Sequence, residues 1–159
     1  MKDISIKLDE KDRKILMILQ KNARENLTVI ARQVGLSIDS VHKRIKKMQK
    51  ANVFQQSIKI NPVIVGYPLV SDIRIRLRNT HAAKVDKMIS YLRAHPNIIN
   101  LFRMMGEWDI ICVMVGKDAP DLNKTSLEIR DKFADIISDW RSCLQLELLK
   151  FEHYDMTKL

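Results

Sequence analysis

The chain has 159 residues, of which 46% are hydrophobic and 30% charged, and its formal net charge is +9. This composition allows one ordinary domain or two small ones and excludes a disordered or collagen-like protein. No apolar run is long enough for a membrane helix, the first residues are unlike a signal peptide, and two cysteines exclude a disulfide framework. We therefore expect a cytoplasmic protein without membrane attachment.

The basic excess is confined to the first part of the chain. Residues 1–61 contain 14 Lys and Arg against 6 Asp and Glu, whereas residues 62–159 contain 14 against 13. This asymmetry is typical of a nucleic-acid-binding module joined to a nearly neutral one. A solvated basic surface or a patch that binds anionic membranes would show the same excess of charge. The arrangement of the residues is therefore needed to distinguish these possibilities.

Three helices are predicted in the first part of the chain. Asp9 or Asp12 can begin the first helix, because acidic residues are favourable in a first turn. Thr28 is a candidate N-cap of the second helix, and Gly35 follows where a tight turn needs a positive φ. Ser37 can cap the third helix, whose apolar positions form one buried stripe. Two helices joined through a glycine turn have the spacing of a helix-turn-helix.

The exposed face of the third helix carries the groups that a DNA major groove would need. Ser40, His42 and Lys43 lie near the helix N-terminus, where helix-turn-helix proteins usually contact base edges. The cations farther along are expected to bind phosphates, which fix position without reading sequence. The alternative is a merely solvated basic helix. The predicted DNA-binding residues are Thr28, Ser37, Asp39, Ser40, His42, Lys43, Arg44, Lys46, Lys47 and Lys50.

A short strand over residues 55–61 is predicted to follow the third helix as a minimal wing. Asn52 before it tolerates the left-handed backbone conformation. Pro62 and Gly66 then mark a linker. We expect a DNA-binding domain over residues 1–61, a linker over 62–68 and a second domain over 69–159.

The second part shows strand and helix signals in the order βαββαβ, which matches a ferredoxin-like fold. The strand segment over residues 110–115 is apolar on both faces, which suggests that another subunit covers its outer face. The predicted elements are a strand over 69–78, a helix capped by Thr80 and stopped by Pro96, strands over 98–105 and 109–115, a helix that starts at Pro120 and includes Ile136 and Ile137 on its inner face, and a strand over 143–150.

Several segments together carry a resemblance to a known family. Gly106-Glu107-Trp108-Asp109 looks like a Gly-x-aromatic-Asp turn that is typical of that family. The other matching positions are Leu8-Asp9-Glu10, Asp12, Ile15-Leu16, Leu19-Gln20, Asn22-Ala23-Arg24, Ile30-Ala31, Val34-Gly35-Leu36-Ser37, Val41, Arg44-Ile45 and Asn61-Pro62 with Gly66. On these positions the chain resembles the Lrp/AsnC family of prokaryotic transcription regulators (leucine-responsive and asparagine regulators, or feast/famine regulators).

The resemblance implies an α+β fold with an N-terminal winged helix-turn-helix and a C-terminal ferredoxin-like (RAM-type) βαββαβ domain. It implies a sequence-specific regulator that binds double-stranded DNA at a pseudo-palindromic operator, as a homodimer that assembles into tetramers or octamers. It also implies a small effector, an amino acid or a related molecule, bound between subunits. The predicted effector-binding residues are Gly106, Glu107, Trp108 and Asp109, with Gln145 reaching in from the neighbouring subunit.

Other interpretations of these residues stay open at this stage. Gly106 and Asp109 can simply form a hairpin with a side-chain-to-backbone hydrogen bond. The chain offers neither a zinc-ligand spacing nor a glycine-rich phosphate loop, so no metal, cofactor or catalytic group is expected. A sensor that oligomerises without binding DNA is conceivable, although the basic helix disfavours it.

An enzyme related to the sirohaem decarboxylases would share this two-domain outline. It would need a basic, histidine-containing tetrapyrrole pocket in the second part of the chain. The nearly neutral charge of that part and the strongly basic helix in the first part argue against this alternative. The residues that such a pocket could use are Arg74, Arg76, Arg78, Arg103, His81 and His95.

Overall fold

The computed structural model describes residues 7–78 and 81–158, which form two compact units. The first unit consists of the residues up to Lys59 together with those from Leu149 onward, and the second unit spans Ile60–Leu148. None of the described helices is long and apolar enough to cross a membrane.

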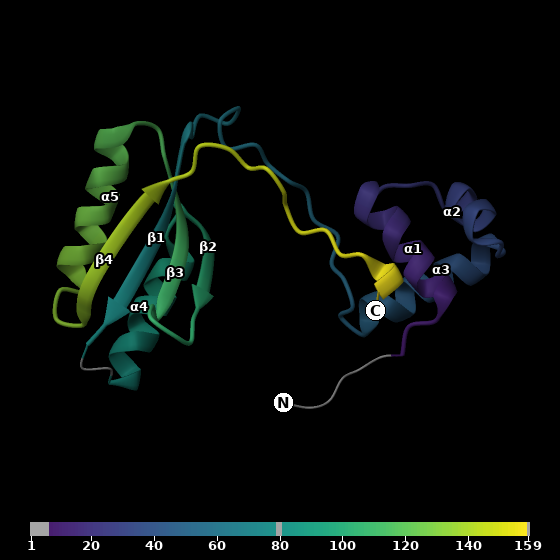
Figure 1. The fold of residues 1–159 in the computed structure, drawn as a ribbon, viewed down its shortest axis with the longest axis horizontal. Helices are drawn as coiled ribbons and strands as arrows, with labels where there is room; N and C mark the ends of the chain where they lie inside the picture. The colour runs from purple at the N-terminus through teal and green to yellow at the C-terminus, as the bar shows by residue number, and fades with distance from the viewer. Residues whose placement is uncertain (1–6, 79–80, 159) are drawn as a thin grey trace. The chain divides into compact units, whose positions relative to one another are not determined.

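The first unit is built from α1 (Glu10–Lys21), α2 (Leu27–Val34) and α3 (Ile38–Lys50) (Figure 1). Each helix contributes apolar side chains to one core, in which Ile15, Ile30 and Val41 are fully buried. Gly35, between α2 and α3, has a φ of 69°, and Asn52 after α3 has a φ of 54°. Both left-handed positions agree with the sequence analysis, so the predicted helix-turn-helix is confirmed.

Side-chain caps define where these helices begin. Asp9 caps α1 in a reciprocal capping box with Asp12, and the Ser37 side chain accepts a hydrogen bond from the Ser40 N–H of α3 at 3.2 Å. The predicted N-cap of α2 was wrong, because the Asn26 side chain accepts from the Thr28 N–H at 2.9 Å. Thr28 therefore lies inside the first turn. Both residue types can cap a helix, and the cap one position before Leu27 brings this apolar residue into the helix.

The predicted wing and the predicted domain limits differ from the structure. Residues 54–61 form no strand, because no described segment pairs with their backbone in a ladder. The final residues were expected in the second domain but pack on the first unit. The side-chain amide of Gln20 donates to the Tyr154 carbonyl at 3.0 Å and accepts from its N–H at 2.8 Å, while Met156 packs against the helical core. A short 3-10 helix, η1 (Met156–Lys158), ends this segment.

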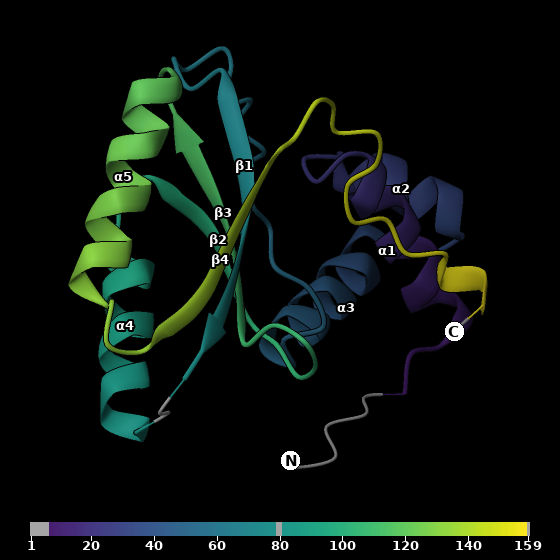
Figure 2. The ribbon, with the colours of Figure 1, turned by 60° about the vertical axis from the view of Figure 1, so that its left-hand side comes forward.

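The second unit has the predicted ferredoxin-like order of elements. All neighbouring strands are antiparallel, in the spatial order β2-β3-β1-β4. Both helices cover the same face of this sheet (Figures 1 and 2). The elements are β1 (Leu69–Leu77), α4 (Ala82–Ala94), β2 (Ile98–Arg103), β3 (Ile110–Gly116), α5 (Ala119–Lys132) and β4 (Ile137–Leu144).

The last helix and strand of this unit correct the sequence analysis. α5 stops at Lys132, and Ile137 begins β4, so the last strand lies several residues before the predicted 143–150. Leucines alternate more regularly after residue 144 than apolar residues do in β4. The ladder nevertheless ends there, because Leu144 already pairs with Ser71 near the beginning of β1. The predicted Thr80 cap of α4 lies outside the described residues.

β3 is buried on both faces, as its composition suggested. On the helix-covered side, Cys112 and Met114 join the core of the unit. On the outer side, Val113 is 8% exposed and Val115 3% exposed in the single chain. These two valines are therefore buried without a second subunit. The apolar composition of this strand is for that reason no evidence of a subunit contact. An apolar part of the outer face is still open at Phe102, which is 52% exposed and pairs with Ile111.

Candidate nucleic-acid interface and effector turn

The exposed face of α3 gathers the basic residues predicted to bind DNA. Val41, Ile45 and Met48 are buried on one side of the helix. The opposite side exposes His42 and Lys43, and neither of them forms an ion pair or a side-chain hydrogen bond within residues 7–78 and 81–158. Lys46, Lys47 and Lys50 are exposed and unpaired in the same described ranges. The face is therefore a row of donors and cations that is free to bind another molecule.

The N-terminus of α3 leaves one hydroxyl group available to a ligand. The Ser37 hydroxyl accepts from the Ser40 N–H and donates to the Ser40 hydroxyl oxygen at 2.8 Å, so its hydrogen-bonding capacity is used by the cap. Ser40 keeps its own hydroxyl proton for another acceptor. Asp39 and Thr28 are exposed in the first turns of α3 and α2, where helix dipoles favour anionic partners.

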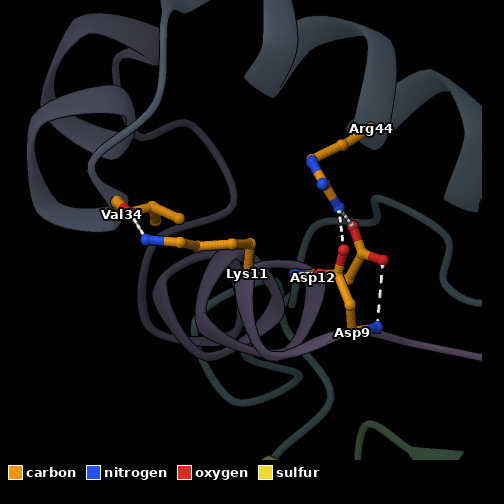
Figure 3. Close-up of polar contacts among 5 residues, drawn as sticks. All are labelled: Asp9, Lys11, Asp12, Val34 and Arg44. Carbon is orange, nitrogen blue, oxygen red and sulfur yellow. Dashed lines mark hydrogen bonds and ion pairs between the residues drawn. The ribbon is translucent and has the colours of Figure 1, made fainter.

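Arg44 is engaged inside the protein, unlike the other cations of α3. Its Nη1 atom donates to Asp9 Oδ2 at 2.6 Å and to Asp12 Oδ1 at 2.7 Å (Figure 3). The backbone N–H of Asp12 and the guanidinium of Arg44 hold the pKa of Asp9 below its usual value, and the two carboxylates raise the pKa of Arg44. One nitrogen of Arg44 is therefore engaged within the protein, and its predicted contact with a phosphate stays a prediction.

Lys11 makes a second polar contact that the sequence analysis did not identify. Its ammonium group donates to the carbonyl oxygen of Val34 in the last turn of α2 (Figure 3). A cation is favourable there because the carbonyl groups at a helix C-terminus lack intrahelical partners. Asp9, Lys11 and Asp12 thus connect α1 to both helices of the helix-turn-helix. The acidic first turn of α1 was visible in the sequence, but its partner 32 residues later was not.

The predicted effector turn connects β2 and β3 and is fastened to β1. Gly106 has a φ of 144°, which favours glycine. Arg76 donates to the Glu107 carboxylate at 2.9 Å and to the Glu107 carbonyl at 3.1 Å. The Asp109 side chain accepts from the Leu77 N–H at 2.8 Å. This bond reaches a neighbouring strand and not the backbone of the hairpin itself, so it fastens the turn to β1, and an effector role for Asp109 stays a prediction.

Trp108 is buried beneath two arginines. Trp108 is 8% exposed, and the guanidinium carbons of Arg76 and Arg141 lie 5.0 and 5.2 Å from the centroid of its ring. Such cation–π contacts stabilise a fixed ring orientation. The indole is therefore packed beneath the turn, the Arg76 and Glu107 side chains around it are accessible, and an effector contact of Trp108 stays a prediction.

Gln145 does not join this turn within one subunit. Its side-chain amide donates to Asp72 at 2.9 Å, and its backbone N–H donates to the Val70 carbonyl at 2.8 Å. The turn instead contacts Leu77 at the other end of β1. Because a strand rises about 3.3 Å per residue, the two ends of β1 are roughly 26 Å apart. Any contact of Gln145 with this site would have to come from another subunit.

The residues that a tetrapyrrole pocket would need are not assembled in one cavity. Two open grooves of the second unit hold about 530 and 670 Å³; Arg103 lines the first, and none of the six predicted residues lines the second. Arg76 is paired with Glu107, and Arg78 donates to the Ala134 carbonyl at 3.0 Å. Within the described residues, no group of three His, Cys, Asp or Glu side chains is placed to hold a metal ion.

Comparisons with known protein families cover both units. Residues 8–49 match the model of the AsnC-type helix-turn-helix domain, and residues 73–150 match the Lrp/AsnC ligand binding domain. The HTH-type transcriptional regulator FL11 of Pyrococcus furiosus is 30% identical over 117 residues, which are 73% of this chain and 76% of the relative. The regulator Ptr1 of Methanocaldococcus jannaschii is 31% identical over 118 residues, 74% and 78% of the two chains.

Solved structures show the same fold over nearly the whole chain. An AsnC family transcriptional regulator from Agrobacterium tumefaciens has a TM-score of 0.85 at 24% identity and covers 96% of this chain and 99% of its own. A transcriptional regulator from Neisseria meningitidis, solved in complex with L-Met, has a TM-score of 0.83 at 24% identity over 91% and 94% of the two chains. At this identity the likeness extends to the fold alone.

Proposed function

Because the chain belongs to the Lrp/AsnC family of transcription regulators, we propose that it binds a pseudo-palindromic operator as a homodimer or larger assembly and that an amino acid or related effector changes this binding. Membership in this family makes it a DNA-binding regulator and not an enzyme. The observation that supports the proposed contacts is the exposed face of α3, whose side chains from His42 to Lys50 include the unpaired cations described above.

The position of each side chain along α3 suggests its role on DNA. Ser40, His42 and Lys43 lie in the first turns of the helix, the part that reaches base edges in helix-turn-helix proteins. Lys47 and Lys50 lie in its last turn and are better placed for phosphates. Base contacts specify the operator, whereas phosphate contacts set the affinity and its dependence on salt.

The exposed apolar residues of the second unit support the proposed homodimer. Phe102 and Ile99 on β2 are 52% and 50% exposed. Large exposed apolar side chains often mark a protein–protein contact, and we propose a second copy as the partner of the outer face near β2. Two helix-turn-helix units related by a two-fold axis would require an operator with two half-sites, spaced by one helical turn of DNA or a multiple of it.

The effector proposal is supported by the charges around the Gly106–Asp109 turn. A free amino acid carries an ammonium group, which the Glu107 carboxylate or the unused oxygen of Asp109 could accept. Its carboxylate could bind backbone N–H groups near Gly106, where no side chain obstructs the approach. Gln145 of a neighbouring subunit could then contact the effector side chain. The Neisseria meningitidis relative, solved with L-Met, is consistent with a ligand of this class.

A genome-wide DNA-binding selection with the purified full-length protein tests the proposal. We expect fragments enriched in a two-half-site motif and a change in the bound set when single amino acids are added. The triple variant His42→Ala, Lys43→Ala, Lys47→Ala should lose this enrichment. The matched control is Lys87→Ala, Lys124→Ala, which removes exposed cations from α4 and α5. Retained enrichment in a folded triple variant would refute the proposed DNA interface.

A further inference from the structure

Arg44 differs from its neighbours on α3 because its charge is already matched inside the protein. We infer that Arg44 is a positioning residue for DNA recognition and that it acts through Asp9 and Asp12, which orient α3 against α1. This inference rests on the proposed DNA-binding face of α3. It assigns a role in operator discrimination to two carboxylates that belong to a different helix.

The geometry fixes the guanidinium on the α1 side. One nitrogen, Nη1, is shared between the two carboxylates at 2.6 and 2.7 Å, and both side chains point toward it (Figure 3). The Asp12 side chain is 10% exposed and that of Arg44 31% exposed, so the contact is partly shielded from solvent. Shielding of this kind strengthens a charge-assisted hydrogen bond compared with one in bulk water.

The two carboxylates are themselves held in place. Asp9 Oδ1 accepts from the Asp12 N–H at 2.8 Å, and Asp12 Oδ2 accepts from the Asp9 N–H at 3.2 Å. Each carboxylate therefore uses one oxygen for the α1 cap and the other for Arg44. Within residues 7–78 and 81–158, these two contacts are the side-chain hydrogen bonds that link α1 to α3. A rigid helix start thus serves as the anchor for α3.

The local charge disfavours a phosphate at this position. Two carboxylates and one guanidinium leave a formal charge of −1, whereas the exposed lysines of α3 have no described acidic partner. A phosphate would be attracted to the lysines and repelled from the Arg44 cluster. The rival possibility is that the free donors of Arg44, Nε and Nη2, bind a phosphate while Nη1 holds the carboxylates.

Loss of the anchor should affect discrimination more than general affinity. Arg44 lies next to Lys43 and two residues after His42 on the same helix. A rotation or tilt of α3 would therefore displace the side chains proposed to read bases. Phosphate contacts made by flexible lysine side chains tolerate such a shift better, because they do not require a fixed fork geometry.

The test compares Arg44→Gln, Asp12→Asn and the double variant in the full-length protein. The probes are the tightest-binding fragment selected by the wild type and a scrambled fragment of equal length, titrated between roughly 50 and 200 mM salt. Asn at position 12 can still accept the Asp9 N–H, so α1 keeps its cap. Lys47→Ala is the matched control for a phosphate contact, and thermal unfolding confirms that each variant is folded.

We expect each single variant to lower the ratio of specific to scrambled affinity by about tenfold, with an unchanged salt slope. The double variant should lose no more than either single one, because the residues act as a pair. Lys47→Ala should instead reduce the salt slope by about one and weaken both fragments equally. The inference would be overturned if Arg44→Gln also reduced the salt slope and weakened both fragments equally while Asp12→Asn bound both fragments like the wild type. If the wild type binds neither fragment, the DNA-binding proposal itself fails.

Should Arg44→Gln not fold, Arg44→Lys and Asp12→Asn provide the same distinction. Lysine retains a cation for a phosphate but lacks the planar guanidinium. A lowered ratio in Asp12→Asn alone supports positioning, since Asp12 carries a charge that phosphates repel. An unchanged ratio in a folded Asp12→Asn variant contradicts it.

Discussion

The Asp109 carboxylate holds the turn with one oxygen and leaves the other oxygen available to a ligand. One of its oxygens accepts from the Leu77 N–H, and the residue is only half-buried. Replacement by Ala would leave a backbone N–H without its partner, at a cost of about 1–3 kcal/mol. Asp109→Asn is the better probe, because an amide oxygen can still accept that hydrogen bond while the negative charge is removed.

If the Gly106–Asp109 turn binds an amino acid, at least one of the standard amino acids should raise the melting temperature, because a ligand of the folded state stabilises it. Asp109→Asn should abolish the shift and leave DNA binding without effector largely intact. Thermal unfolding with each amino acid measures this. Lys117→Gln, an exposed charge change beyond β3, is the control. Absence of any shift in the wild type would contradict the amino-acid proposal without touching DNA binding.

Tyr91 provides a residue-level test of how α4 packs on α5. Its hydroxyl donates to Glu128, which raises the pKa of Tyr91 to about 12 and lowers the pKa of Glu128. Because the folded-state pKa of Tyr91 lies above its ordinary value of 10.0, this bond stabilises the fold below pH 10 and is lost as pH rises toward 12. An absorbance titration of tyrosinate should show a late step that Tyr91→Phe removes. Complete ionisation near pH 10 would contradict the contact.

At the scale of elements, α3 combines a local cap with two kinds of exposed side chain. Its cap at Ser37 and its buried stripe are typical of any amphipathic helix. What distinguishes α3 is the order of polar groups along its open face, with Ser40 and His42 near the start and Lys47 and Lys50 near the end. Substitutions at the two ends of α3 should therefore impair DNA binding in different ways.

Replacing Lys47 or Lys50 by Ala should weaken binding about equally on all DNA sequences and lower the salt slope by roughly one for each lost phosphate contact. Replacing His42 or Lys43 should relax discrimination at particular operator positions, by about 1–3 kcal/mol where a bidentate base contact is lost. Gel shifts over a salt series with single-base operator variants distinguish the two effects. Identical behaviour of the variants from both ends of α3 would argue against the assignment.

At the scale of the whole molecule, the proposed assembly would use the outer face of the sheet. Val113 lies on this face, but it is buried in the single chain, so a charge there would disturb folding as well as any subunit contact. Phe102 is half exposed on the same face and offers a cleaner test.

The chain also leaves the first unit at Lys59 and returns to it at Leu149, so two covalent segments connect the units.

Phe102→Asp should shift the protein toward monomers and weaken binding to a two-half-site operator, because a charge would then face the subunit contact. Light scattering at micromolar concentration measures the assembly. Leu127→Asp is the matched control, since Leu127 is a 44% exposed apolar residue on α5. A wild type that is monomeric, or a Phe102→Asp variant with unchanged mass, would refute the proposed contact.

The sequence by itself was sufficient for features that depend on near neighbours. The Ser37 cap, the left-handed Gly35 and the order βαββαβ follow from hydrogen bonds and apolar periodicity within a few residues of each position. The resemblance to a family was carried by the same short segments, and it pointed to the function that the comparisons support.

Only the tertiary structure decided which distant groups meet. Arg44 has the same charge as the lysines around it, and nothing nearby in the chain shows that it faces Asp12, 32 residues earlier. Asp109 likewise finds its partner at Leu77, and Tyr154 finds Gln20 from the opposite end of the chain. Such contacts form only after the core has brought separate elements together. A charge or an amide can bind many partners, and the packed backbone selects which one it reaches.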